Sequence, residues 1–551
     1  MRVKGIICSA FVAILLVGRV AVASVEKPMP LNDAMFSVTI SDLHGFLDGA
    51  GLVAQQVSPM FNGAMLTQML GGQFGDPQLT GIAPKHGLAF VMFDAESSVA
   101  FIEVEKAQSL AYSNAVSSSR ISCAYVDGIL LVSDEKKNVE FGEKYIKQVK
   151  EKLLARREAS LRIVGSPEVL IAKNEQEIKE LFNGSALMEG MNQTLKNSPK
   201  QKAFQIKVVQ GELSFFLSVL RQIKAIEITL LPDAGSLHIS ELFVPVSGTP
   251  LATFCAAPVV NKPNELLQSG LFKNGTFGVD FFFGNPDAFV QFISGELKKM
   301  ATELKWDQKK VDQLLAPSLK LVSLFAGSGA EVVRFDSSTG IGVDYVMAIK
   351  DEAAALTLIK EQISEKSNLM NFYKNIDMPM EYTFVENARV YKEVKIHQLK
   401  MNFKLEKTTP QEQVMYKKMG LSNLTYEIAF VNGVLIGSTV QKELEPLIDQ
   451  LKSGKINETP LKARAVFPSD ATYYIDFNLA GYVNFVAGIL PPEAAKAQPV
   501  MQNLAASLAG ESIISAGYRK EGVFKHTTII TGSLIGKLGQ FVMQMATMGQ
   551  R

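Results

Sequence analysis

The chain has 551 residues, of which 47% are hydrophobic and 20% charged, and its formal net charge is +1. This composition excludes a wholly disordered chain, and a length well beyond about 300 residues excludes a single hydrophobic core and favours two or three domains. Because the net charge is close to zero, no overall field would draw the chain to nucleic acid, and we expect no nucleic-acid partner.

The first 23 residues have the pattern of a signal peptide. Arg2 and Lys4 precede the apolar stretch from Gly5 to Val17, and Ala21-Val22-Ala23 provides a small-x-small cleavage site. The apolar stretch is shorter than the roughly 20 residues that span a bilayer, so we predict cleavage after Ala23 rather than a membrane anchor. No later segment has the length and hydropathy of a transmembrane helix. The mature chain is therefore expected to be exported to the periplasm or the cell exterior.

A strand followed by a helix opens the mature chain. Residues Phe36 to Ile40 alternate apolar and polar side chains, which predicts a half-buried strand, and Leu43 to Leu47 begin a helix. The same unit recurs at Phe277–Phe281 with Ala288–Val290, at Tyr473–Phe477 with Leu479–Val483, and in a weaker form at Val169–Ile171.

The segment from Leu52 to Leu70 is rich in flexible apolar side chains, including Met60, Phe61, Met65 and Met69. Such side chains suit an adaptable apolar groove. They equally suit a helix whose apolar stripe faces an ordinary core, which is the more frequent role of such a stripe. The sequence leaves both interpretations open.

Two predicted hairpins share an Asx-Gly turn. Asp127-Gly128 interrupts an apolar run, and Asn432-Gly433 interrupts a closely similar run in the other half of the chain. Both dipeptides are typical of two-residue hairpin turns. Two further hairpins are predicted to turn at Gly235 and at Gly522. We therefore assign these six residues structural turn roles.

The recurring elements follow the same order in both halves of the chain. This order predicts an α+β protein of two tandem homologous domains, each a curved antiparallel sheet packed with helices, at about 30–255 and 276–548. The intervening residues 256–275 are rich in Pro, Asn and Gly and are predicted to be a linker. A β insertion is expected at about 380–420, with two strands around a turn at Glu386-Asn387-Ala388.

The sequence contains no recognisable catalytic or metal-binding motif. Its five histidines are scattered, and it lacks the H-E-x-x-H, C-x-x-C, calcium-loop and G-x-S-x-G patterns. We therefore predict no catalytic, cofactor-binding or metal-binding residue and no cofactor. Cys123 and Cys255 either form a disulfide in an oxidising compartment or stay as buried thiols. Convergent carboxylates remain an open alternative, because spacing in sequence does not show convergence in space.

The repeated units resemble a family of exported bacterial proteins of unknown function, built from duplicated strand-helix and hairpin-helix modules. The resemblance lies in Phe36–Leu47, in Gly81–Pro84 before Leu88–Phe93, and in Tyr391–Leu399. It implies export and a large α+β fold, and it carries over no catalytic residue.

Together these features predict a non-enzymatic exported protein of the cell envelope or periplasm that acts by binding or as a structural component. A first alternative is a carrier of lipid or another apolar ligand in a cavity between sheet and helices. A second alternative is a hydrolase whose site assembles from carboxylates distant in sequence. The partner of this protein is accordingly expected to be an apolar ligand or an envelope component.

Overall fold

The computed structural model describes residues 34–548 with gaps. Two longer segments, 177–209 and 260–274, are outside the description, as are 95, 117–120, 155–158, 173, 175, 212–213, 234–235, 283–285, 304, 337–339, 365, 376–379, 406–409, 421, 441–442, 455–460 and 491–497. The predicted signal peptide, most of the predicted linker and the turn glycine Gly235 therefore lie outside the described residues.

The chain forms two compact units that interleave along the sequence. Unit 1 comprises Met1–Asn174, Ile223–Pro245 and Val523–Arg551, and unit 2 comprises Glu175–Gln222 and Val246–Gly522. These units are defined by contacts between residues, whereas the two predicted domains are defined by similar sequence elements. The bounds of the units therefore do not test the bounds of the predicted domains. The last strand and helix of the chain belong to unit 1.

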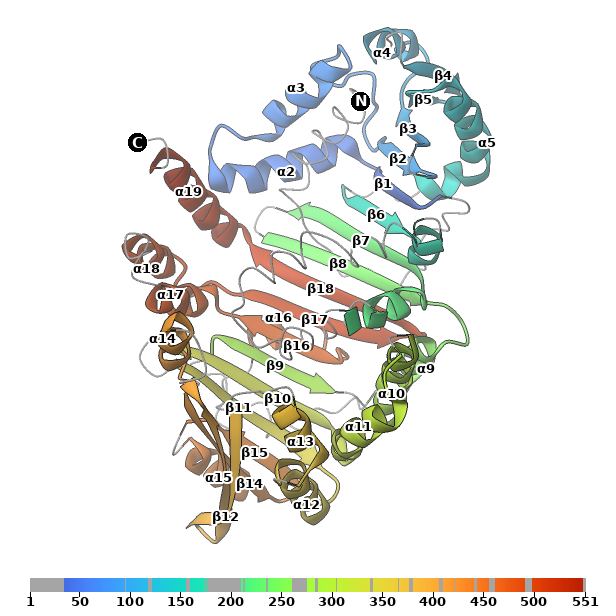
Figure 1. The fold of residues 1–551 in the computed structure, drawn as a ribbon. Coiled ribbons are helices and arrows are strands. Elements are labelled where there is room, and N and C mark those ends of the chain that lie inside the picture. The colour runs from blue at the N-terminus through green and yellow to red at the C-terminus, as the bar shows by residue number, and fades with distance from the viewer. Residues whose placement is uncertain are drawn as a thin grey trace. The chain divides into compact units, whose positions relative to one another are not determined.

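The described part of unit 1 has a nine-stranded antiparallel sheet, coloured mainly blue and green in Figure 1. Its strand order is β4-β5-β3-β2-β1-β6-β7-β8-β18. The strands are β1 Phe36–Ile40, β2 Leu88–Met92, β3 Ser98–Glu103, β4 Ser122–Val126, β5 Ile129–Ser133, β6 Leu161–Gly165, β7 Ile223–Asp233, β8 Ser236–Pro245 and β18 Val523–Thr531.

Helices cover this sheet with two clusters of buried apolar side chains. One cluster joins β2, β3 and β5 to α5 through residues such as Phe101 and Val149, and the other joins β1 to α2 through Ile40 and Phe46. The helices of unit 1 are α2 Leu43–Val57, α3 Gly63–Gln73, α4 Ser109–Val116, α5 Lys136–Leu153 and α19 Gly532–Met548.

The described part of unit 2 also has nine antiparallel strands, in the order β12-β13-β14-β15-β11-β10-β9-β16-β17. The strands are β9 Phe277–Phe282, β10 Phe325–Asp336, β11 Gly340–Ile349, β12 Met380–Tyr391, β13 Val394–Phe403, β14 Asn423–Val431, β15 Val434–Ser438, β16 Tyr473–Phe477 and β17 Ile513–Lys520.

One apolar core of unit 2 lies between this sheet and α15, where Ile396, Ile436 and Ile448 are fully buried, and a second, smaller cluster is built around Ile349, Ile428 and Leu435. The helices of unit 2 are α9 Pro250–Ala256, α10 Pro286–Glu303, α11 Gln308–Ser323, α12 Glu352–Ile363, α13 Asn368–Asn375, α14 Pro410–Lys418, α15 Leu444–Ser453, α16 Lys462–Val466, α17 Leu479–Ile489 and α18 Gln498–Ser507. Among the residues described in either unit, no helix is both long and apolar enough to cross a membrane.

Seven neighbouring strands have the same order in the two units. The order β4-β5-β3-β2-β1-β6-β7 in unit 1 matches β14-β15-β11-β10-β9-β16-β17 in unit 2. Equivalent backbone bonds recur as well. The Val104 N–H donates to Gly128 O at 3.1 Å, and the Ile349 N–H donates to Gly433 O at 2.7 Å, so each Asx-Gly turn is held against the neighbouring strand.

The α+β class with a large antiparallel sheet is confirmed, whereas two local predictions are wrong. Val169–Ile171 is helical rather than extended. The strand is the preceding β6, and Ser166 and Pro167 then start a helix, with Leu170 N–H donating to Ser166 O at 2.9 Å. Proline at the first helical position has its φ already set for a helix, a signal that the apolar pattern concealed.

The predicted turn at Glu386-Asn387-Ala388 lies inside β12. These three residues are opposite the single residue His397 of β13, so they form a bulge, and the Asn387 N–H donates to His397 Nδ1 at 3.2 Å. The hairpin turns instead at Lys392 and Glu393, whose φ values are +44° and +69°. Asn387 does adopt a positive φ of +52°, but the strand continues beyond it.

Candidate functional site

The first helix of unit 1 has one face that packs and one that does not. The Asp42 side chain accepts a hydrogen bond from the Gly45 N–H at 3.0 Å and so caps the start of α2. The residues Leu43, Phe46, Leu47, Ala50 and Val53 recur at helical spacing and are buried against the sheet. Leu52 lies outside this stripe and is exposed.

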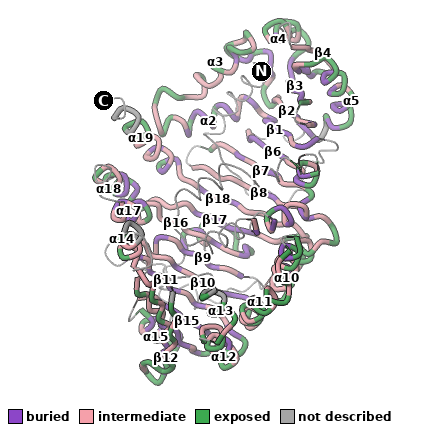
Figure 2. Tube along the Cα trace, viewed as in Figure 1, coloured by how far each residue is buried: buried purple, intermediate pink, exposed green. Residues whose placement is uncertain are grey.

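The next helix, α3, packs against the core only through partly buried side chains, Leu66 and Leu70. Asn62 caps it by accepting a hydrogen bond from the Met65 N–H at 2.8 Å, and its only buried residue is Gly71. A Cβ added at Gly51 of α2 would lie 2.0 Å from the backbone N of Gly63, so the two helices meet through glycine backbone. Figure 2 accordingly shows α3 in pink and green, with little purple.

The C-terminal helix α19 packs on α2 in the same way. An added Cβ would lie 2.6 Å from the Gln56 carbonyl oxygen at Gly536, and 2.5 Å from the Val57 side chain at Gly539. Val542 and Met543 follow one turn later and are exposed. The close glycine contacts fix the three helices as a rigid support for the side chains that point away from them.

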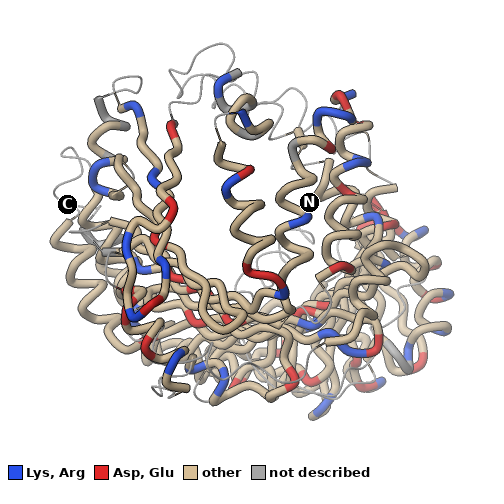
Figure 3. The backbone as a smooth tube through the Cα atoms, turned by 90° about the horizontal axis from the view of Figure 1, so that it is seen from below, with Lys and Arg blue, Asp and Glu red and all other residues tan. Residues whose placement is uncertain are grey.

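We call α2, the loop Ser58–Asn62, α3 and α19 the apolar platform. Six large apolar side chains of the platform are exposed. The most exposed are Met60 at 72%, Val542 at 64% and Met69 at 53%, and the other three are Leu52, Phe61 and Met543. The residues 43–73 and 532–548 contain only two Asp, Glu, Lys or Arg side chains, Asp48 and Lys537. Most of α19, next to the C-terminus in Figure 3, is accordingly drawn in tan.

The platform contains all four apolar residues that the sequence singled out. Met60, Phe61 and Met69 are exposed and Met65 is partly buried. Sequence reasoning missed α19, which lies far away along the chain. The available signal was its composition, because α19 has a single charged residue in 17.

Four of the predicted turn residues lie at the ends of hairpins whose strands pair. Asp127 and Gly128 join β4 to β5 with φ values of +50° and +86°, and Asn432 and Gly433 join β14 to β15 with +52° and +77°. A positive φ at both central residues defines a type I′ turn, which matches the twist of the flanking strands. Gly522, with φ of +77°, lies in the connection from β17 to β18.

Unit 2 carries a row of polar side chains on the face of the sheet that packs against α15. The registers place Asp344, Ser438, Glu427 and Gln398 opposite one another on the neighbouring strands β11, β15, β14 and β13. Residues opposite one another in adjacent strands share a face of the sheet. Asp344, Ser438 and Glu427 are buried.

Two arginines pair with this row. Arg389 of β12 donates to both carboxylate oxygens of Glu427, at 2.9 and 2.6 Å, and to Glu445 of α15 at 2.7 Å. Arg334 forms an ion pair with Asp344, which also accepts a hydrogen bond from the Ser438 hydroxyl at 2.5 Å. Arg389 therefore binds both carboxylates that face it, and it links strand β12 to α15.

The matching positions of unit 1 carry no charge. Counted from the two Asx-Gly turns, Ser122 holds the position of Glu427, and the register of β3 with β5 places Val99 at that of Asp344. Val99 is part of an apolar cluster. This strand order therefore forms without the charges, and burying an ion pair costs desolvation free energy that an apolar pair does not. The charged row is a property of unit 2 rather than a requirement of the strand order.

A second buried ion pair lies on β9. Asp280 is 0% exposed, and its Oδ2 accepts a hydrogen bond from Arg464 Nε at 2.6 Å, while its Oδ1 has no hydrogen-bond partner. The Arg464 guanidinium lies over the rings of Phe282 and Tyr474, at 5.3 and 4.9 Å from their centroids. Burial raises the pKa of Asp280 to about 6, although the charge of Arg464 opposes this shift.

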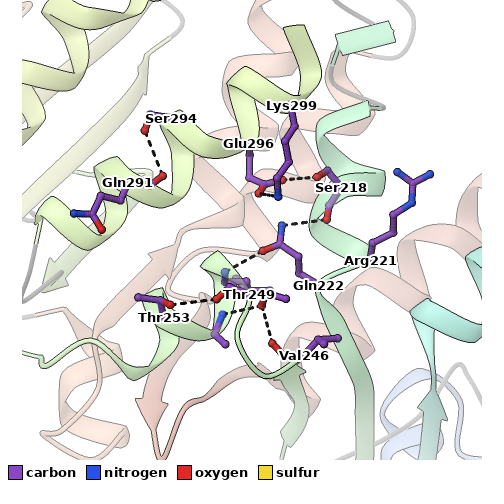
Figure 4. Close-up of polar contacts among 12 residues, drawn as sticks. Ser218, Arg221, Gln222, Val246, Thr249, Thr253, Gln291, Ser294, Glu296 and Lys299 are labelled. Carbon is purple, nitrogen blue, oxygen red and sulfur yellow. Dashed lines mark hydrogen bonds and ion pairs between the residues drawn. The ribbon is translucent and has the colours of Figure 1, made fainter. Parts of the chain in front are cut away.

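A third polar cluster joins the helix that contains residues 214–220 to α10 (Figure 4). The Ser218 hydroxyl donates to Glu296, and Lys299 Nζ donates to the same carboxylate at 2.7 Å. Burial pushes the pKa of Glu296 upward, but hydrogen bonds from Lys299 and Ser218 outweigh it and lower the pKa overall. Ser218 and Glu296 are both buried, so this pairing fastens one helix to another.

The cysteines and possible metal ligands give no further site. Cys255 of α9 is a buried free thiol, so it forms no disulfide with Cys123, and burial raises its pKa to about 11. The structurally described residues include no group of three or more His, Cys, Asp or Glu side chains placed to hold a metal ion.

No protein-family model, curated protein or solved structure matches the chain. The function of the site is therefore inferred from its own residues.

Proposed function

We propose that this chain is an exported, non-enzymatic protein of the cell envelope or periplasm that binds an apolar partner through the apolar platform. The single observation that carries the proposal is the exposure of large apolar side chains on helices that have almost no charge. Export rests on the predicted signal peptide.

The physical support is the cost of leaving such a surface in water. Removing apolar surface from water stabilises a complex by roughly 25 cal/mol per Å². Soluble monomers rarely expose contiguous apolar patches unless the patch has a partner. The glycine contacts of α2 with α3 and α19 oppose an inward rotation of the helices, because the backbones already touch. Met60 and Met69 are flexible side chains that adapt to partners of differing shape.

The proposal is tested with the mature protein and the uncharged dye Nile red, whose fluorescence rises in apolar surroundings. Saturable binding is expected for the wild type. The double variant Met60→Gln/Met69→Gln should weaken it by about tenfold, because burial of each side chain contributes on the order of 1 kcal/mol or more. A matched control is Val390→Gln/Val466→Gln, which changes two exposed apolar residues of unit 2.

Circular dichroism and the unfolding temperature of each variant establish that the fold is intact. No saturable dye binding by the wild type would refute the proposal. So would equal losses in the platform variant and the control variant.

We also propose that the two matching strand orders arose by duplication of one α+β module. The same order of seven strands, the paired Asx-Gly turns and the equivalent backbone bonds to Gly128 and Gly433 support it. Experimental coordinates of β1–β8 and of β9–β18 without the insertion should superpose strand by strand. A different strand path in either half would rule out the duplication.

A further inference from the structure

We infer that the partner of the apolar platform is the surface of a lipid bilayer with uncharged or zwitterionic headgroups. This inference rests on the proposed function and names its partner. Three properties of the platform support it: its charge, its residue types and the position of its most exposed side chains.

The first property is charge. Proteins that recognise anionic membranes use clusters of Lys and Arg near the surface. The platform segments 43–73 and 532–548 offer one lysine, Lys537, and one aspartate, Asp48. A surface with so little charge complements an apolar phase, and it gains nothing from anionic headgroups.

The second property is residue type. The largest contributions at the centres of protein interfaces come from Trp, Tyr and Arg, although Phe and Met are enriched there too. The segments 43–73 and 532–548 contain none of these three residue types, and their apolar side chains are mostly Leu, Val, Ile, Met and Phe. A hydrocarbon phase is well matched by such side chains, since it offers neither hydrogen-bond partners nor fixed shape.

The third property is position. A small apolar ligand is held by concave sites that enclose most of its surface. The loop Ser58–Asn62 instead exposes its apolar side chains. Met60 is 72% exposed, and Phe61 follows it in the connection between two capped helices. The Pro59-Met60-Phe61 tip is therefore a wedge that enters a soft apolar phase. Gly539 of α19 packs against Val57 at the same end of α2, and the exposed Val542 and Met543 follow Gly539 along α19.

The inference is tested by flotation of the mature protein with phosphatidylcholine vesicles in a density gradient. The wild type is expected to float with the vesicles, equally at physiological and at high salt, because no charge attraction is involved. Met60→Gln/Phe61→Gln should reduce the vesicle-bound fraction by about tenfold or more. Val390→Gln/Val466→Gln should float as the wild type does.

Three results would overturn the inference. They are a wild type that stays at the bottom of the gradient, flotation only with phosphatidylglycerol vesicles and only at low salt, and equal losses in both variants. Nile red binding, measured on the same protein preparations without vesicles, separates the two proposals. Platform-dependent dye binding without flotation refutes the bilayer and keeps the apolar partner, whereas loss of both refutes both.

Discussion

Glycine residues have opposite effects in this fold according to their backbone conformation. Gly433 has a φ of +77° in a type I′ turn, a region that costs other residues free energy. Gly295 lies inside α10, where an added Cβ would meet no atom within 4 Å. The first glycine is required by geometry, and the second only weakens its helix.

Gly433→Ala is therefore expected to lower the free energy of unfolding by about 1–2 kcal/mol, because alanine disfavours the left-handed conformation. Gly295→Ala is the matched control and should leave stability unchanged or raise it by up to about 1 kcal/mol. Urea unfolding followed by circular dichroism measures both. Equal changes in the two variants would contradict the type I′ assignment.

Asp280 gives a pH dependence whose sign follows from its burial. Its pKa rises from 3.8 to about 6 on folding, so the folded state binds more protons than the unfolded state between these values. The stability that this difference contributes is present below pH 4 or so and is lost as pH rises through about 6.

Asp280→Asn removes this titration. The unfolding free energy of the wild type minus that of the variant is expected to fall by about 2–3 kcal/mol between roughly pH 4 and pH 7. Chemical unfolding of both proteins across this range measures it. A difference that grows with pH would mean that the Arg464 ion pair outweighs burial, contrary to the raised pKa.

At the scale of whole elements, close contacts decide which helices belong together. The helices α2 and α19 begin almost 500 residues apart yet meet through Gly536 and Gly539. Strand β12 is held in a different way, through the ion pairs of Arg389 with Glu427 and Glu445.

Gly536→Ala is expected to destabilise the docking of α19 by about 1–3 kcal/mol, because the new Cβ would lie 2.6 Å from a backbone oxygen of α2. Gly72→Ala is the control, since its Cβ would meet nothing within 4 Å. Hydrogen exchange should become faster in α19 and the end of α2 only in the Gly536 variant. Unchanged protection there would show that the helices separate without cost.

Arg389→Met is expected to cost about 2–4 kcal/mol, because it leaves the buried Glu427 carboxylate without its main partner. Lys360→Met breaks the exposed Lys360–Glu386 pair nearby and should cost no more than about 1 kcal/mol. Unfolding free energies and hydrogen exchange in β12 measure both effects. A larger loss in the Lys360 variant would refute the anchoring role of Arg389.

At the scale of the molecule, the chain returns to unit 1 at its end. β18 pairs with β8 along its length, with Thr527 opposite Ser240, and leads into α19 of the apolar platform. The stability of unit 1 therefore depends on residues that follow the long segment Val246–Gly522 of unit 2 in the sequence.

Truncation after Gly522 removes β18 and α19 and is expected to accelerate hydrogen exchange in β7, β8 and α2 by at least about tenfold, because β8 loses a neighbouring strand and α2 loses a packed helix. Strands β9 to β11 of unit 2 serve as the internal control and should keep their protection. Unit 1 strands that keep full protection would contradict the contacts of β18.

The sequence by itself determined the features that depend on neighbouring residues. Alternation at Phe36–Ile40 and the Asx-Gly dipeptides at 127–128 and 432–433 act locally, because strand pleating and positive φ are properties of a few residues. The α+β class follows from the order of such elements. The sequence also singled out Met60 and Met69, but the same apolar stripe is compatible with a core and with an open surface.

Only the tertiary structure decided which of these roles the stripe has. Gly51 brings α3 close to α2, so that Leu66 and Leu70 pack against the core while Met60 and Met69 stay exposed. Helix α19 joins α2 from a distant part of the chain, and Arg389 contacts Glu427 and Glu445. These contacts join residues far apart in sequence, and their free energy depends on distances that no local pattern encodes. The apolar side chains of the platform are exposed because of long-range backbone packing. Their local spacing is equally compatible with a buried position.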